Sequence, residues 1–245
     1  MANEAAEVDR SVCIQTYTGR WFDLANPRPE DVDPLDIAIS LSRKCRFGGH
    51  CLKFYSVAQH VVLVTLWMAQ SLQSTRDGWA RTLLWSILHD GHEPYTGDIT
   101  RPMKRAMSRE GYQNCLPQIT ERIDWAVRDR FGLGSIAGFM LDVVREFDLK
   151  LLATEYRDLM RPGLDWGEIK GVQPAAWTII PLGPDEAFSL FCEFFRRIQD
   201  VQPATHQELL AIALQYGAVR LPVEGGGSQP AAAQQRSDEA PAVGA

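Results

Sequence analysis

The sequence predicts a mainly α-helical fold, and three observations support this prediction. Apolar residues recur at intervals of three and four along most of the chain, which is the spacing of one helix face. Stretches with β-prone residues are short and lie mainly near the N-terminus. The chain has 245 residues, 45% of them hydrophobic and 23% charged, which suits one soluble domain with a buried core.

The composition also limits the expected partners and compartment. The net charge of −6 gives no reason to expect a nucleic-acid polymer as a partner. The acidic, polar N-terminus does not resemble a signal peptide, and the longest apolar stretches fall far short of the ~20 residues that cross a bilayer. The five cysteines are odd in number and lack CxxC spacing, which indicates reduced thiols. We therefore expect a cytoplasmic protein without a membrane partner.

The N-terminal region is expected to contain a β-hairpin and the first helix. The stretch VCIQTYTGRWFDL joins β-prone residues through a turn at Thr18-Gly19. Asp33 and Pro34 suit the cap and the first position of a helix through LDIAISLSR. The paired glycines in KCRFGGHCLKFY predict a second small hairpin or a loop.

Further helices follow from the apolar spacing, and Pro94 is expected to end one of them at Glu93. The expected helices are 57–73, one from 77 to the turn in EPYTGD, one after Pro102, and then 117–131, 136–161, 184–199 and 206–217. We divide the chain into an N-terminal extension (1–13), a folded domain (14–221) and a segment of small and polar residues (222–245) that is expected to be a disordered tail.

Three of the expected helices place an ionisable group on their apolar side. His60 shares a face with the valines that flank it by three and four positions. His89 and Asp90 end the next helix near its buried side, and Asp148 lies on the apolar side of the longest helix. Buried charged groups are normally paired or bound to a metal. Two imidazoles and two carboxylates suit a divalent transition ion such as Mn²⁺, Fe²⁺ or Co²⁺, with positions left open for water and substrate.

This arrangement resembles the H…HD…D signature of the HD-domain metal-dependent phosphohydrolases. The stretches FYSVAQHVVLV, HDGHEPYTGDITRPMK and EFDLKLLATEYRDL are similar to the three ligand segments of one branch. That branch contains the bacterial 5′-deoxynucleotidases and related phage dATP triphosphohydrolases. The resemblance covers roughly residues 14 to 162 and implies an HD-domain helical bundle with hydrolase activity.

The resemblance also implies roles for individual residues. Glu93 would act as general acid or base, and Asp98 would orient the attacking water, although ligation of a second metal by Asp98 stays open. The bound ion could be Mn, Co, Fe, Zn or Mg. Its implied ligands are His60, His89, Asp90 and Asp148.

Basic residues near the motifs are the candidates for binding a substrate phosphate. Arg46 is the first choice, because related enzymes place an arginine shortly before the first histidine segment. Arg43, Lys53 and Lys104 are further candidates, whereas Lys150 is expected to point away from the metal.

Other conspicuous residues are expected outside the ligand set. The pattern does not require His50 or His92, which we expect to be solvated or close to the substrate. Glu155 is expected to form a salt bridge rather than to bind metal. The aromatic run that begins at Phe188 is expected in the core or at a subunit contact.

The expected function is a divalent-metal-dependent hydrolase of the 5′ phosphate of a nucleotide or deoxynucleotide, with a small-molecule nucleotide as substrate. One alternative is a triphosphohydrolase that releases triphosphate from a deoxynucleoside triphosphate. Another is an HD module that binds nucleotide without turnover, and an enzyme for a cyclic dinucleotide or a guanosine alarmone ranks lower. A homo-oligomer is plausible because relatives often form dimers or larger rings.

Overall fold

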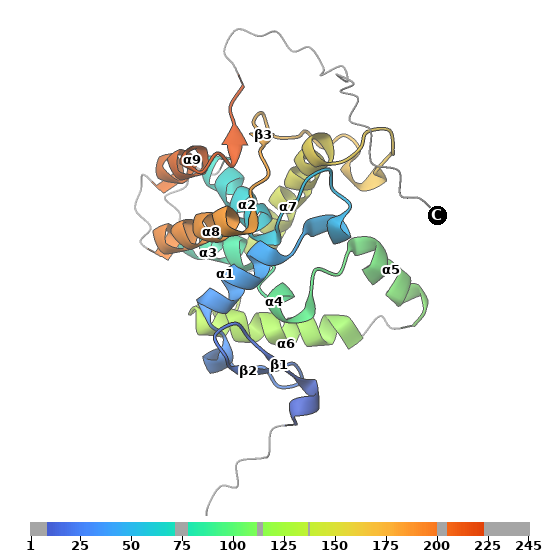
Figure 1. Ribbon diagram of the computed structural model, residues 1–245, viewed down its shortest axis with the longest axis vertical. Coiled ribbons are helices and arrows are strands. Elements are labelled where there is room, and N and C mark those ends of the chain that lie inside the picture. The colour runs from blue at the N-terminus through green and yellow to red at the C-terminus, as the bar shows by residue number, and fades with distance from the viewer. Residues whose placement is uncertain (1–8, 72–77, 112–114, 137, 200–204, 223–245) are drawn as a thin grey trace, which may run out of the picture.

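The described part of the chain folds mainly as α-helices, which confirms the predicted class (Figure 1). The computed structural model describes residues 9–71, 78–111, 115–136, 138–199 and 205–222. The helices are α1 (Pro34–Arg43), α2 (Val57–Ser71), α3 (Trp79–Leu88), α4 (Glu93–Thr96), α5 (Arg101–Arg109), α6 (Cys115–Arg130), α7 (Gly138–Leu159), α8 (Pro184–Gln199) and α9 (Thr205–Gln215). Among the described residues, no helix combines the length and apolar character needed to cross a membrane.

Helix α2 forms the centre of the fold. Nearly all of its side chains are buried, and it packs against α1, α3, α7, α8 and α9. A helix that is apolar on all sides is stable only when other elements cover it completely. The Ser56 hydroxyl accepts a hydrogen bond from the Gln59 amide at 3.1 Å and so caps the start of the helix. His60, one turn into α2, is therefore held in the buried centre of the fold.

The predicted N-terminal hairpin is present. Strand β1 (Cys13–Gln15) pairs antiparallel with β2 (Trp21–Asp23), and Gly19 supplies the positive φ of 83° in the turn. The Thr18 amide and hydroxyl donate to the buried Asp36 carboxylate at 2.7 and 2.8 Å, which fixes the hairpin to α1. A 3-10 turn (Arg10–Val12) leads directly into β1.

The chain between α1 and α2 is a loop rather than a second hairpin. It contains a 3-10 turn (Arg46–Gly49) and closes through a single bridge between Cys45 and Ser56. The expectation that Pro94 ends the helix at Glu93 is wrong, because Glu93 begins the short helix α4 and Pro94 is its second residue. Proline is tolerated in a first turn, where its missing N–H would have no helical partner.

A second small sheet joins the C-terminal part of the described chain to the core. Strand β3 (Thr178–Ile179) pairs antiparallel with β4 (Val219–Arg220), and strands this short leave no periodic signal in the sequence. The buried side-chain amide of Gln59 donates through Nε2 to the Ile180 carbonyl at 2.8 Å and accepts through Oε1 from the Leu182 backbone N–H at 2.9 Å. These bonds fasten the segment to α2. The expected tail lies outside the described residues from residue 223 onward, as do residues 1–8.

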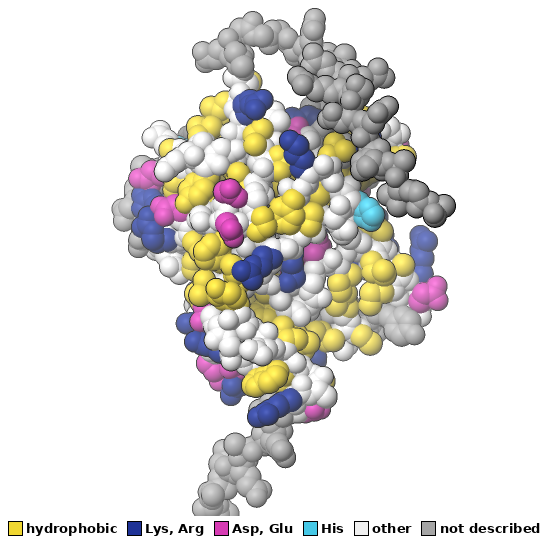
Figure 2. Space-filling view, viewed as in Figure 1, with side chains coloured by type: hydrophobic (Ala, Val, Ile, Leu, Met, Phe, Trp, Pro, Cys, Tyr) yellow, Lys and Arg dark blue, Asp and Glu magenta, His cyan; other side chains and the backbone are white. Residues whose placement is uncertain are grey.

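Helix α8 covers the core with the predicted aromatic face. Phe191 and Phe194 are almost fully buried and Phe195 is 9% exposed, and the helix that carries them packs against α1, α2 and α3. On the face of the molecule in Figure 2, basic and acidic side chains are interspersed rather than gathered by sign. The part of the chain that this view shows therefore presents no long basic surface for a nucleic-acid backbone.

Candidate metal centre

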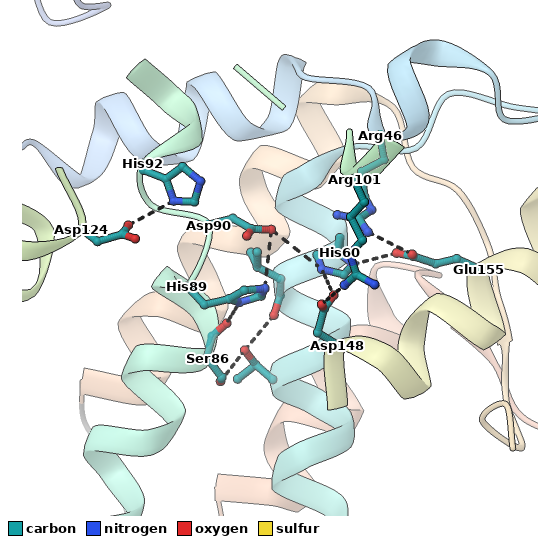
Figure 3. A network of polar contacts seen from close by, with 12 residues as sticks. Arg46, His60, Ser86, His89, Asp90, His92, Arg101, Asp124, Asp148 and Glu155 are labelled. Carbon is teal, nitrogen blue, oxygen red and sulfur yellow. Dashed lines mark hydrogen bonds and ion pairs between the residues drawn. The ribbon is translucent and has the colours of Figure 1, made fainter. Parts of the chain in front are cut away.

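Two histidines from neighbouring helices direct the same ring atom to one point (Figure 3). His60 on α2 is fully buried, and its Nδ1 is paired with Glu155 Oε1 at 2.7 Å. His89 follows α3, and its Nδ1 lies 2.7 Å from the Ser86 carbonyl oxygen, to which it must donate. Each Nδ1 is thus occupied, so Nε2 is the nitrogen that each ring would offer to a metal ion, which would displace any proton bound there. Metal-bound histidines are held in the same way, by a carboxylate or carbonyl on the other ring nitrogen.

Asp90 adds a carboxylate oxygen between the two rings. Its Oδ2 lies 3.9 Å from His60 Nε2 and 3.5 Å from His89 Nε2. The ligand atoms of His60, His89 and Asp90 all lie within 4.8 Å of one another. Atoms that share a divalent transition ion at about 2.0–2.2 Å are roughly 3–4.4 Å apart, so only a small movement is needed. His60 Nε2 is buried and faces the carboxylates of Asp90 and Asp148, which is the environment expected of a ligand atom.

Asp148 lies at the edge of the triad that His60, His89 and Asp90 form. Its Oδ1 is 3.2 Å from His60 Nε2, and its Oδ2 is held by the guanidinium of Arg101 at the start of α5. The structure therefore brings together the four residues expected as ligands, and one of them is shared with an arginine. Lys150, two residues further along α7, turns away and pairs with Glu146.

A buried network of charged side chains contacts His60 at Nδ1, the ring nitrogen on the side away from the other expected ligands. Glu155, which is fully buried, pairs with His60 on one side and with Arg46 Nη2 at 3.2 Å on the other. Burial and Arg46 act to lower the pKa of His60, but Glu155 and Asp148 outweigh them and raise it to about 9. Burial opposes ionisation of Asp148, yet His60 and the other cations lower the pKa of its carboxyl. An imidazole with such high proton affinity lies in a field that also favours a metal cation.

Arg46 was the first choice for a phosphate ligand, but its contact is with Glu155. Replacing Arg46 with methionine removes the positive partner of a fully buried carboxylate, which typically costs about 3–5 kcal/mol of unfolding free energy. Urea unfolding measures this change. The matched control is Arg43→Met in the same segment, because Arg43 is exposed and stacks on Tyr17 at 5.4 Å, a contact worth only about 0.5–1 kcal/mol. Equal losses in the two variants would contradict a structural role for Arg46.

The turn that carries His89 and Asp90 depends on a glycine. Gly91 lies directly against α6, and a Cβ there would be 2.8 Å from the Leu88 carbonyl oxygen and 3.0 Å from a Val127 methyl. The Gly91 amide donates to the Leu88 carbonyl at 2.8 Å, and the Glu93 amide donates to the Asp90 carbonyl at 3.0 Å. The chain therefore turns tightly enough to place the HD pair and Glu93 on the same side.

Glu93 and Asp98 form an acidic pair next to the triad. Glu93 is 4% exposed, and its Oε2 has no hydrogen-bond partner in the described chain. Burial, with the nearby carboxylates of Asp90 and Asp98, raises the pKa of Glu93 well above its usual value. Glu93 is therefore favoured as a protonated acid that could donate a proton, while the partly exposed Asp98 is the more accessible of the two.

The remaining candidates occupy several environments. His50 and Lys53 are exposed, and Lys104 is exposed on α5 but close enough to act on the charge of Glu93. His92, expected to be solvated or near the substrate, is mostly buried, and its Nδ1 pairs with Asp124 Oδ1 at 3.1 Å. It lies outside the triad.

Comparison with known proteins places this architecture in a family. The chain is 34% identical over 192 residues to the uncharacterized protein YfdR of Escherichia coli K12, a match that covers 77% of this chain and 97% of YfdR. This chain belongs to the YfdR family. An uncharacterized protein of Rhodobacter capsulatus is 34% identical over 121 residues, or 49% of this chain and 58% of the relative. No family model matches the chain.

In this member of the YfdR family, sequence reasoning missed two cations at the site. Lys44, which follows α1, donates to the Ser40 hydroxyl at 2.6 Å and lies 3.4 Å from the Pro94 carbonyl oxygen. Burial lowers the pKa of Lys44, while Glu93 and Asp98 oppose that effect. Arg101 was also missed, although it stands within HDGHEPYTGDITRPMK, because only the folded chain reveals its contact with Asp148.

Proposed function

We propose that this protein is a divalent-metal-dependent phosphohydrolase that acts on the 5′ phosphate of nucleotides or deoxynucleotides. The observation that carries the proposal is the orientation of His60 and His89. His60 presents Nε2 to the carboxylates of Asp90 and Asp148, His89 presents Nε2 to Asp90, and Glu93, whose pKa is raised, lies beside them. The resemblance to HD-domain phosphohydrolases, with 5′-deoxynucleotidases among them, supports the same reaction.

His60, His89, Asp90 and Asp148 would hold the metal. Such an ion lowers the pKa of a bound water and polarises a phosphoryl oxygen. Mn²⁺, Co²⁺, Fe²⁺, Zn²⁺ and Mg²⁺ are the candidates, and the imidazole ligands favour a transition ion over Mg²⁺.

Glu93, Asp98 and Lys44 would provide the proton, the orientation of the water and the charge balance that a metal ion does not provide. Burial and the neighbouring carboxylates raise the pKa of Glu93, which favours its protonated form, and that form could give its proton to the oxygen of the leaving nucleoside. Asp98 can accept a hydrogen bond from the attacking water and so orient it. Lys44, next to both acids, limits the build-up of negative charge around them.

An aromatic pair near the site favours a nucleotide over a simpler phosphate ester. Phe47 has a left-handed backbone with a φ of 58°, which is rare for a residue with a side chain and often marks a functional position. Its ring lies 5.9 Å from that of Trp166, and both residues are partly exposed. Phe47 directly follows Arg46, so a base stacked on this pair would lie near the centre.

A metal and substrate panel tests the proposal. The purified protein is stripped with a chelator, reloaded with each candidate ion and given deoxynucleoside mono- and triphosphates, with phosphate and triphosphate measured separately. We expect no turnover without metal and release of phosphate from monophosphates with at least one transition ion. Release of triphosphate instead would favour the triphosphohydrolase. Tight nucleotide binding with no turnover under any metal would favour a non-catalytic module, against which the presence of both Glu93 and Asp98 argues.

A further inference from the structure

Four cations are expected from the sequence to bind phosphate, and one of them, Lys104, is exposed on α5. Arg46 contacts Glu155, Arg43 stacks on Tyr17, and Lys53 is exposed. One guanidinium does reach the metal centre. Arg101 forms an ion pair with Oδ2 of Asp148, and the Arg101 side chain is still 42% exposed. It is therefore accessible to a substrate that approaches Asp148.

Helix α5 extends this cationic site away from the metal. Arg101, Arg105 and Arg109 are spaced by four residues and so lie along one side of the helix, about 5–6 Å apart at Cβ. Arg105 Nη2 pairs with Glu168 Oε2 at 2.9 Å, and Arg101 Nη1 lies 3.7 Å from the same oxygen. One carboxylate oxygen thus serves two guanidinium groups. Within the described chain, Arg109 and Lys104 have no carboxylate partner, so α5 keeps a surplus of positive charge.

The contacts of Arg101 and Arg105 are suited to exchange. Arg105 is 65% exposed and Glu168 is 30% exposed, so their ion pair contributes little to stability. A groove lined by Arg105, Arg109, Pro102, Ala106 and Glu110 continues along the helix. A divalent ion at Asp148 would repel Arg101 and weaken its hold on that carboxylate. A phosphoryl group, with its negative charge and with pairs of oxygens that can accept two parallel N–H···O bonds, offers both arginines a stronger partner.

We propose that Arg101 and Arg105 form the phosphate-recognition site of this protein, in which Arg101 exchanges Asp148 for the phosphoryl group at the metal and Arg105 exchanges Glu168 for the next phosphoryl group along the ligand. The site takes phosphate esters and anhydrides, and it binds ligands with two contiguous phosphates more tightly than those with one. The inference rests on the proposed function, because the exchange at Asp148 requires a bound metal.

Binding measurements on the full-length, metal-loaded protein test this assignment. Inorganic phosphate and pyrophosphate are titrated calorimetrically at a fixed excess of free metal ion, and the metal affinity of each variant is measured by competition with a chelating dye. We expect Arg101→Gln to weaken phosphate binding by about tenfold or more, with metal affinity unchanged or increased. Arg105→Gln should leave phosphate binding intact and weaken pyrophosphate binding by about tenfold.

Three further variants separate recognition from structure. Arg145→Gln, an exposed arginine of α7 that pairs with Asp142, is the matched control and should change neither titration. Arg101→Lys keeps the positive charge but cannot form the bidentate hydrogen bonds of a guanidinium, so it should bind phosphate more tightly than Arg101→Gln and less tightly than the parent. Glu168→Gln releases Arg105 and should tighten pyrophosphate binding, a gain that damage to the fold would not produce.

The outcomes also separate this inference from the proposed function. Phosphate affinity in Arg101→Gln equal to that of the parent overturns the assignment, and so does weakened metal binding, which would make Arg101 a support for Asp148. If these results accompany nucleotide turnover by the parent, only the inference fails. A parent that binds no divalent metal overturns both.

Discussion

Replacing His89 with alanine should abolish metal binding at the centre and reduce phosphohydrolysis to the background rate. The His89 Nε2 atom is one of three ligand atoms within 4.8 Å of one another, and no other described histidine can take its place. Loss of a residue that only supports a ligand typically costs 10–100-fold in metal affinity, so loss of a ligand itself should cost more than about 100-fold. Metal content after gel filtration and turnover of the preferred nucleotide measure the two effects.

His92 provides a closely matched control. The side chains of His89 and His92 are 12% and 13% exposed and lie three residues apart, but His92 is paired with Asp124 and lies outside the triad. His92→Ala should therefore retain the metal, even where loss of the Asp124 pair lowers stability. Circular dichroism should show folded helix in both variants. Equal metal loss in the two would refute the ligand set that the geometry indicates.

The centre was accessible to sequence reasoning because helix periodicity carries three-dimensional information. His60 and Asp148 share helix faces with apolar residues, and the HD pair ends a periodic segment, so their convergence could be anticipated. Glu155 was expected to form a salt bridge and does so. Its partner could not be identified, because Arg46 comes from a distant loop whose conformation has no periodic signal.

The parts that escaped prediction depend on contacts between distant segments. Arg101 reads as an ordinary surface cation near a helix start until α7 brings Asp148 beside it. Gly91 reads as a helix breaker, although its role is to let α6 approach the HD turn. Strands β3 and β4 are two residues each, too short for a periodic signal, and the segment after β3 is tied to the core by the side chain of Gln59 on α2. In each case the decisive information lies in a partner remote along the chain.

Glu93→Gln should lower the rate of hydrolysis by about 10²–10⁴-fold without loss of metal, because a general acid typically contributes that much. Glutamine keeps the size of the side chain but cannot release a proton to the leaving oxygen. Burial and the carboxylates of Asp90 and Asp98 raise the pKa of Glu93. The substitution leaves the four expected metal ligands in place. Single-turnover kinetics, with metal content measured on the same sample, test the prediction. Glu146→Gln, an exposed residue paired with Lys150, is the control and should leave both quantities unchanged.

The pH dependence distinguishes an acid from a residue that merely fills space. A group whose pKa is raised stays protonated to higher pH, so a general acid at Glu93 works below its raised pKa and fails as pH rises through that pKa. The parent should therefore lose rate on the alkaline side, and Glu93→Gln should lack that decline. Measurements span only the range in which metal content is constant, because proton competition at His60 also changes the rate. An alkaline decline of the same size and midpoint in Glu93→Gln would assign the proton to another group, and Asp98→Asn would then be the next variant to examine.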